Sequence, residues 1–288
     1  MALFNQANEE IQKMHIDKKK CVGCANCVPV CPMGAIYIGD DHLSEINPDA
    51  CVECQACYKG MSVEDLPQQP TRFLRGLLAF GKLRFQPDPD ICPTGAITPD
   101  ELTWPRTIRR TFSDPQVPHE STGVGGRGTQ EVKTNDITGR VKEGEAGFTV
   151  EFGRPGVGAR FADSDALCRR LARMGVEFQA ENPVTALMSD VKTGELRKDI
   201  LPEKVLSYIL EFKTDLTKMT DILTAIEDEV KLLDTVVSLG LAVRCDSNGE
   251  DAVRSQLVAL GYDAWRAKIN MGLGRRTNPV TATPEKQQ

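Results

Sequence analysis

Alternation of apolar and polar positions marks the strands of the second half of the chain. Residues 147–152 and 205–212 alternate with the period of two that a half-buried strand shows. Residues 236–245 carry an apolar side chain at nearly every second position, and residues 176–178 begin a further short strand. A last strand is expected near Trp265.

Helical periodicity separates these strands. Residues 215–233 form the clearest helix, because apolar side chains recur there every three or four positions. A shorter helix follows the first strand, with Asp163 or Ser164 as its N-cap and Gly175 as its terminator. The order β-α-β-β-α-β predicts an α+β sandwich of the split βαβ type over residues 146–274.

The first half of the chain has shorter elements. A strand is predicted around Ile16, and residues 35–38 and 42–46 are predicted to form a hairpin. Residues 71–85 are predicted to form a helix, because their apolar side chains follow roughly helical spacing.

Eight of the ten cysteines change this picture, because they form two runs. The first run lies in CVGCANCVPVCP, whose spacing C-x2-C-x2-C-x3-C-P holds [4Fe–4S] clusters. The second run repeats the motif as CVECQAC, with residues 58–91 inserted before its last cysteine in CPTGAI. Structural zinc sites instead use well-separated C-x2-C pairs, so the spacing favours iron–sulfur clusters. The first run is Cys21, Cys24, Cys27 and Cys31, and the second is Cys51, Cys54, Cys57 and Cys92.

On these runs, and on the Gly-Ala-Ile repeat at 34–36 and 95–97, residues 15–99 resemble a bacterial two-cluster [4Fe–4S] ferredoxin. The resemblance implies a domain over residues 1–100 that transfers single electrons at low potential. It also implies that the last cysteine of each run binds the cluster of the other run. One cluster would be held by Cys21, Cys24, Cys27 and Cys92, and the other by Cys51, Cys54, Cys57 and Cys31.

The insertion, about residues 60–90, has three interpretations. Its helix can pack on the ferredoxin core, dock a partner redox protein or lie on a membrane surface. Each of them is compatible with apolar side chains accompanied by basic ones. The basic side chains that would serve docking are Arg72, Arg75, Lys82 and Arg84.

Residues 101–145 are predicted to be a linker, because they have few apolar residues and contain a glycine-rich stretch at 121–130. Gly123, Gly125 and Gly128 spell G-x-G-x-x-G. No apolar strand precedes them and no amphipathic helix follows, so a dinucleotide site is not expected. The polar tail, residues 275–288, is predicted to be disordered.

Residues 152–178 resemble the first strand, loop and helix of ACT-type regulatory domains. In that family Arg-Pro-Gly before a helix marks a small-ligand loop, often at a dimer interface. The resemblance implies a site for a small anion at Arg154, Gly156 and Gly158, and a homodimer through this domain. Gly158 departs from the family, which has an apolar residue there. Fold-level likeness does not fix function, and a structural sandwich that recruits a partner is the simpler interpretation.

Composition and charge exclude several classes of protein. The net charge of −6 gives no basic footprint for nucleic acid. The first residues carry Glu9 and Glu10 and no apolar run, so no secretory signal is predicted, and no stretch reaches the length of a membrane span. Reduced cysteines in the cytoplasm are therefore expected. Cys168 and Cys245 are predicted to be buried like small apolar side chains.

The leading hypothesis is an electron carrier, specifically the ferredoxin subunit of a cytoplasmic, oxygen-sensitive oxidoreductase complex of anaerobic metabolism. No acid–base pair, nucleophile triad or phosphate loop stands out in the sequence, so no catalytic residue is predicted. Its partner would be a redox protein or the catalytic subunit of that complex. The alternative hypothesis is a redox- or metabolite-responsive regulator whose ACT-like domain binds a small ligand.

Overall fold

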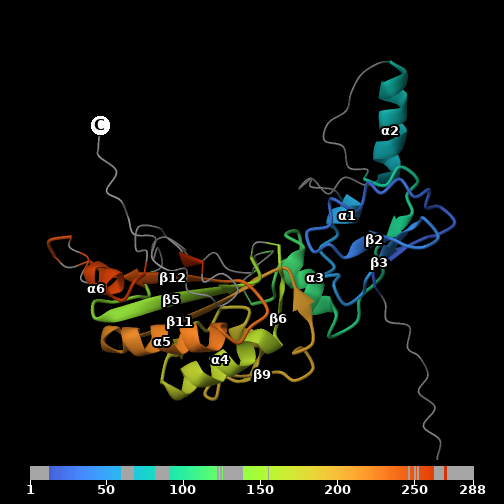
Figure 1. Ribbon diagram of the computed structural model, residues 1–288. Helices are drawn as coiled ribbons and strands as arrows, with labels where there is room; N and C mark the ends of the chain where they lie inside the picture. The colour runs from blue at the N-terminus through green and yellow to red at the C-terminus, as the bar shows by residue number, and fades with distance from the viewer. Residues whose placement is uncertain are drawn as a thin grey trace, which may run out of the picture. The chain divides into compact units, whose positions relative to one another are not determined.

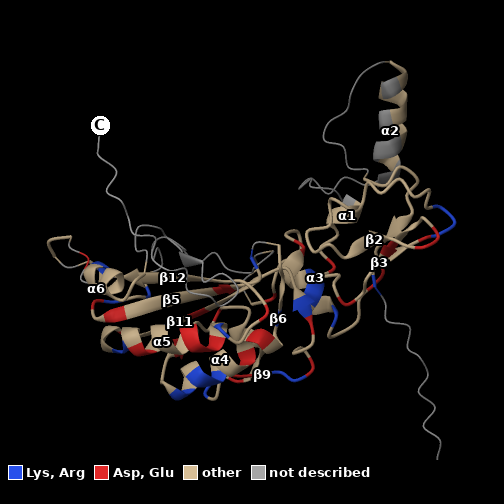
Figure 2. Cartoon of the chain, in the orientation of Figure 1, with Lys and Arg blue, Asp and Glu red and all other residues tan. Residues whose placement is uncertain are grey.

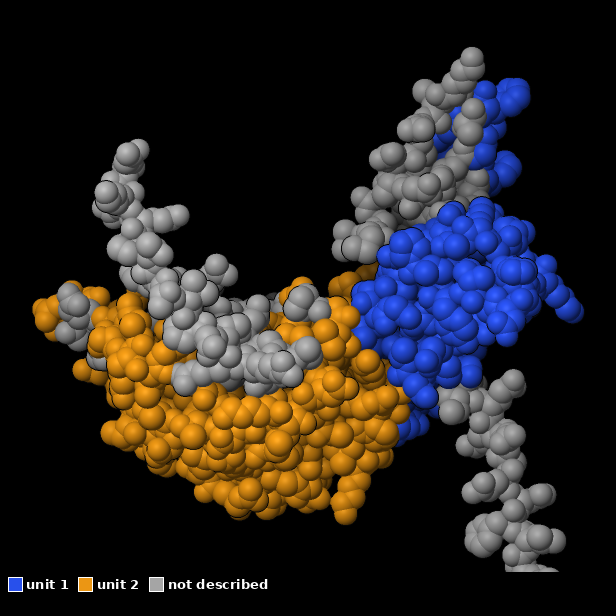
Figure 3. All heavy atoms as spheres, viewed as in Figure 1, with its two compact units in different colours: residues 1–107 blue, residues 108–288 orange. Residues whose placement is uncertain are grey.

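A computed structural model of the chain forms two compact units, residues 1–107 and 108–288 (Figures 1 and 3). Each unit has a hydrophobic core of its own. The residues that the structure describes are 13–59, 68–81, 91–121, 123, 125, 139–154, 156–245, 247–249, 251, 253–262 and 269–270. Among them, no helix has both the length and the apolar character needed to cross a membrane.

Two small antiparallel ladders frame the first unit. Strand β1 (His15–Ile16) pairs with β4 (Ile97–Thr98), and β2 (Ile36–Ile38) pairs with β3 (Ser44–Ile46). The hairpin predicted at 35–46 is thus confirmed. Because β1 precedes the first cysteine run and β4 follows the last cysteine, their pairing brings the two ends of the cysteine-containing segment together.

Two helices lie at and after the last cysteine triplet, before Cys92. Helix α1 (Ala56–Lys59) includes Cys57, and α2 (Gln68–Phe80) forms the described part of the insertion. Residues 82–90 lie outside the described residues. In α2 the side chains of Phe73 and Phe80 are 76% and 93% exposed, and those of Leu74 and Leu77 are also exposed. The interpretation that this apolar face packs on the core is therefore wrong for these four side chains.

An antiparallel sheet of five strands forms the second unit, in the order β13-β12-β5-β11-β7. Its two central pairings are long: β5 runs beside β11 on one side and beside β12 on the other. The side chains of alternate residues on the three long strands β5, β11 and β12 enter the core, where Phe148 stacks on Phe212. The strands are β5 (Glu145–Phe152), β7 (Glu177–Phe178), β11 (Tyr208–Asp215), β12 (Val237–Val243) and β13 (Ile269–Asn270).

Helices α4 (Ala162–Arg173) and α5 (Met219–Val230) lie on the same side of this sheet (Figure 1). Helix α4 connects β5 to β7 and α5 connects β11 to β12, which gives the β-α-β-β-α-β order that the hydrophobic pattern predicts. Acidic residues lie in the first turn of α4 and basic ones in its last turn (Figure 2), which favours the helix dipole. Gly175, with a φ of 75°, follows α4 as predicted.

The rest of the second unit is made of short elements. The segment between β7 and β11 contains a 3-10 turn, one small ladder and a strand that pairs with a short strand preceding α4, and a second 3-10 turn precedes α5. The ladders pair β6 (Ala159–Arg160) with β10 (Lys204–Val205) and β8 (Met188–Asp190) with β9 (Glu195–Leu196). The 3-10 turns are Thr185–Leu187 and Leu216–Lys218, and the last helix among the described residues is α6 (Arg254–Ala259).

The segment predicted to be a linker contains a helix that belongs to the second core. Helix α3 (Thr107–Ser113) buries Ile108 and Phe112 among the core residues of that unit. Arg109, also buried, forms an ion pair with Glu203. Two apolar residues on one short helix are too few to produce a detectable period, which is why the sequence pattern does not show it.

Two finer predictions are wrong. Helix α4 begins at Ala162, before both proposed caps, and the Asp163 carboxylate instead accepts a hydrogen bond from the backbone N–H of Arg160 at 2.7 Å. Cys245 is exposed, because β12 ends at Val243 and the apolar alternation does not continue as a strand beyond it. The prediction for Cys168 is confirmed, since that side chain is fully buried.

Candidate metal centres

The two cysteine triplets adopt the same backbone conformation. In the first, Gly23 and Ala25 have φ angles of 67° and 60°, and in the second, Glu53 and Gln55 have φ angles of 56° and 59°. Positive φ is costly for residues other than glycine, so surrounding structure must hold it. Glu53 and Gln55 are buried, which supplies that support. Each middle cysteine therefore lies between two left-handed residues.

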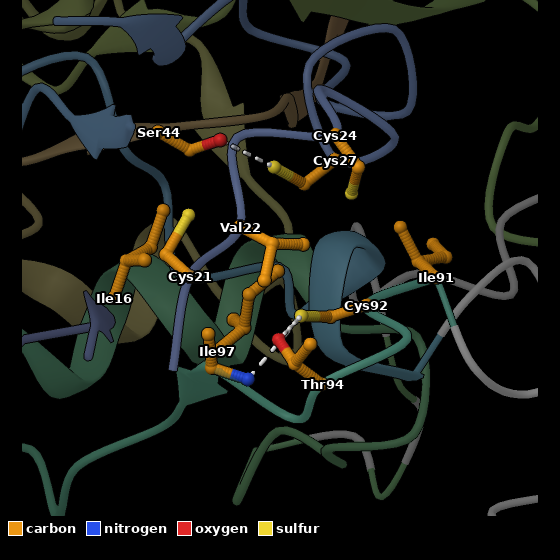
Figure 4. A pocket seen from close by; sticks show the side chains of 11 residues that line it. Ile16, Cys21, Val22, Cys24, Cys27, Ser44, Ile91, Cys92, Thr94 and Ile97 are labelled. Carbon is orange, nitrogen blue, oxygen red and sulfur yellow. Dashed lines mark hydrogen bonds between the residues drawn. The ribbon is translucent and has the colours of Figure 1, made fainter. Parts of the chain in front are cut away.

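The first triplet opens onto a hollow that a cysteine from the second run completes. This first hollow is lined by Cys21, Cys24 and Cys27 from one loop and by Cys92 from beyond the insertion. Figure 4 shows Cys92 entering from the opposite side to Cys24 and Cys27. The remaining walls are mostly apolar: Ile16, Val22, Ile91, Ala96 and Ile97, with Ser44 and Thr94 as the polar exceptions.

A second hollow has the complementary composition. Three of its cysteines belong to the second run, and the fourth, Cys31, is the last of the first run. The two hollows have similar volumes, about 290 Å³ for the first and 340 Å³ for the second, when the space that opens to solvent is included. The structure thus brings together the same two sets of four that the ferredoxin resemblance implies. The cysteines of the second hollow are Cys31, Cys51, Cys54 and Cys57.

Matching hydrogen bonds hold the two crossing cysteines. The backbone N–H of Ala35 donates to Cys31 Sγ at 3.2 Å, and the backbone N–H of Ala96 donates to Cys92 Sγ at 3.2 Å. The Gly-Ala-Ile repeat therefore places an N–H donor four residues after each crossing cysteine. Hydrogen bonds of this kind stabilise the thiolate form, which is the form that binds metal.

The electrostatic environments of the thiols differ. Burial, with the nearby Glu53 carboxylate, raises the pKa of Cys51 to about 12, and burial also raises the pKa of Cys57. The pKa of Cys92 is lowered: burial opposes this, but hydrogen bonds from Thr94 and from the N–H of Ala96 outweigh it. Thiols must lose their protons to bind iron, so assembly of the second site displaces protons from the partly buried thiols of Cys51 and Cys57.

One buried ion pair lies beside the second triplet. Arg106 donates to Glu53 Oε1 from Nε at 2.9 Å and from Nη2 at 2.6 Å. The Glu53 carboxylate also accepts from the backbone N–H of Met14 at 3.2 Å, and Arg106 Nη2 donates to the carbonyl of Pro48 at 3.1 Å. Sequence reasoning missed both residues of this pair. The single hint is that Glu53 stands where the first triplet has Gly23.

The residues predicted to bind a small anion, Arg154, Gly156 and Gly158, do not line these hollows. In the loop after β5, Arg154 is exposed, with Nη1 3.8 Å from Glu151. Gly156 is exposed, whereas Gly158 is buried and its N–H donates to the Gly153 carbonyl at 2.9 Å. Of the four basic residues proposed for docking, Arg72 and Arg75 lie on α2, where their side chains are not described, and Lys82 and Arg84 lie outside the described residues.

The donor chemistry of the two hollows fits one type of inorganic group. Within the described part of the chain, no three His, Cys, Asp or Glu side chains converge as they would around a single metal ion. The thiols surround hollows instead, and four cysteine sulfurs are the ligand set of a [4Fe–4S] cluster. The fold and the hollows therefore define the first unit as an iron–sulfur domain with two cluster sites.

Comparison with known proteins names the family. Residues 13–60 match the family model of the 4Fe-4S dicluster domain. Ferredoxin-1 of Rhodobacter capsulatus is 40% identical over 55 residues, which are 19% of this chain and 74% of that protein. The chain belongs to the ferredoxin family through this segment. Its cofactors are [4Fe–4S] clusters, and the dicluster domain agrees with two of them. Ferredoxin-type electron transfer is the function of such a domain.

Other relatives match over shorter fractions of their length. Ferredoxin YfhL of Escherichia coli K12 is 51% identical over 41 residues, 14% of this chain and 46% of that protein. One chain of the polysulfide reductase of Wolinella succinogenes is 30% identical over 108 residues, 31% of this chain and 51% of that protein. The chain thus spans about half the length of these two relatives. No solved structure matches the chain.

Proposed function

We propose that the chain is an electron carrier with one cluster in each hollow. The first cluster is held by Cys21, Cys24, Cys27 and Cys92, and the second by Cys51, Cys54, Cys57 and Cys31. The observation that carries the proposal is the division of eight cysteines between two hollows, each closed by a cysteine of the other run. A [4Fe–4S] cluster supplies one-electron oxidation and reduction.

The chain's own residues hold the ligands and shield them from water. Apolar walls line both hollows, and the N–H donors of Ala35 and Ala96 neutralise part of the negative charge on sulfur. Shielding is weaker at the first hollow, where Cys24 is exposed and Val22 is 64% exposed. Cys51 and Cys57 of the second hollow are partly covered. Electrons therefore enter or leave most readily through the first site.

The partner is a cytoplasmic oxidoreductase, and α2 is the docking element. Its exposed apolar side chains, Phe73, Leu74, Leu77 and Phe80, make a face that suits an apolar groove on another protein. Arg72 and Arg75 on the same helix favour an acidic rim around that groove. The likeness to one chain of a polysulfide reductase supports a role as a subunit.

Metal and sulfide analysis tests the carrier function. Protein purified without oxygen is expected to contain about eight irons and about eight acid-labile sulfides per chain. After reduction with dithionite and removal of the excess, it should pass about two electrons per chain to an oxidised low-potential viologen. Zinc in place of iron, or about four irons per chain, would refute the two-cluster proposal.

A second candidate function rests on the other unit. The β-α-β-β-α-β order and the glycine-rich loop at 153–158 favour an ACT-like domain that senses a small anion and pairs with a second copy of the chain. Amino acids and small carboxylates should then raise the melting temperature of the full-length protein, because a ligand stabilises the state that binds it. If no such compound shifts the melting temperature, and Arg154→Ala changes nothing, the sensing function is rejected.

A further inference from the structure

Glu53 is a buried charge on the backbone of the second ligand loop. It lies between Cys51 and Cys54, is 3% exposed and has a left-handed φ of 56°. Its carboxylate is held by Arg106 and by the N–H of Met14. The carboxylate and the guanidinium thus form a buried ion pair joined by charge-assisted hydrogen bonds.

The first ligand loop has no equivalent charge. Gly23 occupies the matching place with a similar φ of 67°, and a Cβ there would lie 2.4 Å from the backbone oxygen of His42. No side chain fits at this position without moving the backbone. The two loops are thus alike in backbone conformation and differ in one buried, paired carboxylate.

Arg106 determines what that carboxylate does to the site beside it. Reduction adds an electron to a group already surrounded by thiolates, so an uncompensated negative charge nearby makes reduction harder. Arg106 is itself buried, 8% exposed, and donates two hydrogen bonds to Glu53. Because the local dielectric constant is low, each charge has a strong electrostatic effect on the neighbouring site. The guanidinium lies close enough to the carboxylate to offset that effect.

We propose that the balance of charge between Glu53 and Arg106 controls the reduction potential of the second cluster and leaves that of the first unaffected, so that losing either charge alone shifts only the second potential. Arg106 is a positioning residue: it acts through Glu53, fixing the carboxylate and cancelling its charge. Because Arg106 lies outside both cysteine runs, the segment that follows the ferredoxin motif adjusts only one of its two sites. The proposal rests on the ligand assignment given under the proposed function.

Three variants separate charge from structure. Arg106→Gln leaves a buried carboxylate beside the second site and should lower one midpoint potential. Glu53→Gln leaves the guanidinium and should raise the same potential. The double variant should return it close to the wild-type value. Each single variant should change the reduced-to-oxidised ratio at the wild-type midpoint by about ten-fold, the order expected for one buried unit charge.

The readout is an anaerobic redox titration of the full chain followed by electron paramagnetic resonance, with iron content measured on every sample. Lys18→Gln is the matched control. Lys18 belongs to the same unit and pairs with Asp41 and Glu45, but these groups are solvent-exposed, so both potentials should stay unchanged. Arg106→Lys keeps the charge and should keep the second potential closer to wild type than Arg106→Gln does.

The outcomes separate this proposal from the proposed function. Wild-type protein with fewer than two clusters would refute the ligand assignment itself. Eight irons in the variants, with both potentials unmoved or moved together, would overturn the proposal and leave the carrier function intact. Loss of iron in Arg106→Gln, Arg106→Lys and the double variant alike would also overturn it, because the pair would then be a structural clamp.

Discussion

Single residues determine the shape of the ligand loops, and Gly23 is tightly constrained. Its φ is 67°, and an added Cβ would meet the backbone oxygen of His42 at 2.4 Å. A backbone carbonyl cannot swing aside as a long side chain can. Gly23→Ala should therefore distort the first hollow, and the purified variant should contain about four fewer irons per chain than wild type.

Gly34 is the matched control for this substitution. Its φ is 59°, but nothing lies within 4 Å of an added Cβ. Gly34→Ala should cost about 1–2 kcal/mol of conformational strain and keep the full iron content. Equal iron loss in both variants would mean that positive φ, and not the contact with His42, limits the site.

Substituting Cys92 tests whether the last cysteine of each run binds the cluster of the other run. Cys92→Ser should disturb the first hollow, because Cys92 lines it with Cys21 and Cys24 although Cys57 is closer to those two in sequence. Adding Cys24→Ser to Cys92→Ser should cause little further loss of iron, since both residues serve one site. Adding Cys54→Ser should remove the second cluster as well. The opposite pattern in iron content would show that the runs do not cross.

The eight cysteines are predictable because their spacing is itself the signal. The buried pair beside them is not, since Glu53 and Arg106 are separated by 53 positions and belong to no motif. The apolar alternation also predicts a strand that continues to Cys245, whereas β12 ends at Val243. Periodicity shows which face a residue would take, but not where a strand stops.

At the scale of elements, the insertion can be tested by removal. Cys57, before the insertion, lines the second hollow, and Ile91, after it, lines the first. None of the described residues 68–81 lines either hollow. Replacing residues 61–89 with a short glycine–serine linker should therefore preserve the iron content. The change in loop length should alter the free energy of unfolding by only about 2 kcal/mol.

Ile97→Ser should have the opposite effect to removal of the insertion, because Ile97 lines the first hollow. Ile97 is buried, pairs with Ile16 in the β1–β4 ladder and lines the first hollow. A hydroxyl there should weaken retention of iron, whereas the shortened chain should lose only partner binding. Loss of clusters from the shortened chain would assign the insertion to the site instead of the docking surface.

Long periodic elements were predictable and short ones were not. Helix α5 and strands β5 and β12 match their predicted segments to within a few residues, because many apolar side chains contribute to each pattern. Helix α3 has seven residues and escaped detection. The exposure of the apolar face of α2 could not be foreseen either, because periodicity gives a face but not what covers it.

At the scale of the whole molecule, the two units should differ in what stabilises them. The core of the first unit consists of few apolar side chains and several of the cysteines, so its folding depends on iron. The core of the second unit is large and contains none of the eight cysteines of the two runs. A chelator should therefore unfold the first unit and leave the second folded. Calorimetry should show the loss of one transition while the other keeps its midpoint.

The boundary of the second unit gives the sharpest test of this independence. The sequence places it at residue 146, whereas the structure adds α3, whose Ile108 and Phe112 enter the core. Phe112 packs edge-on against Phe161, with ring centroids 5.2 Å apart, and the N–H of Leu206 donates to Ser113 Oγ at 2.9 Å. Removing one buried phenylalanine typically costs about 3–5 kcal/mol, and removing α3 deletes several such contacts.

A fragment of residues 107–288 should therefore unfold cooperatively without iron, at a denaturant midpoint close to that of the second transition in the full chain. A fragment of residues 146–288 should be less stable by at least about 3 kcal/mol or fail to fold. Phe112→Ala in the longer fragment isolates the packing contribution and should fall between the two. If both fragments unfold at the same denaturant concentration, α3 is dispensable, and the border between the units belongs where the hydrophobic pattern placed it.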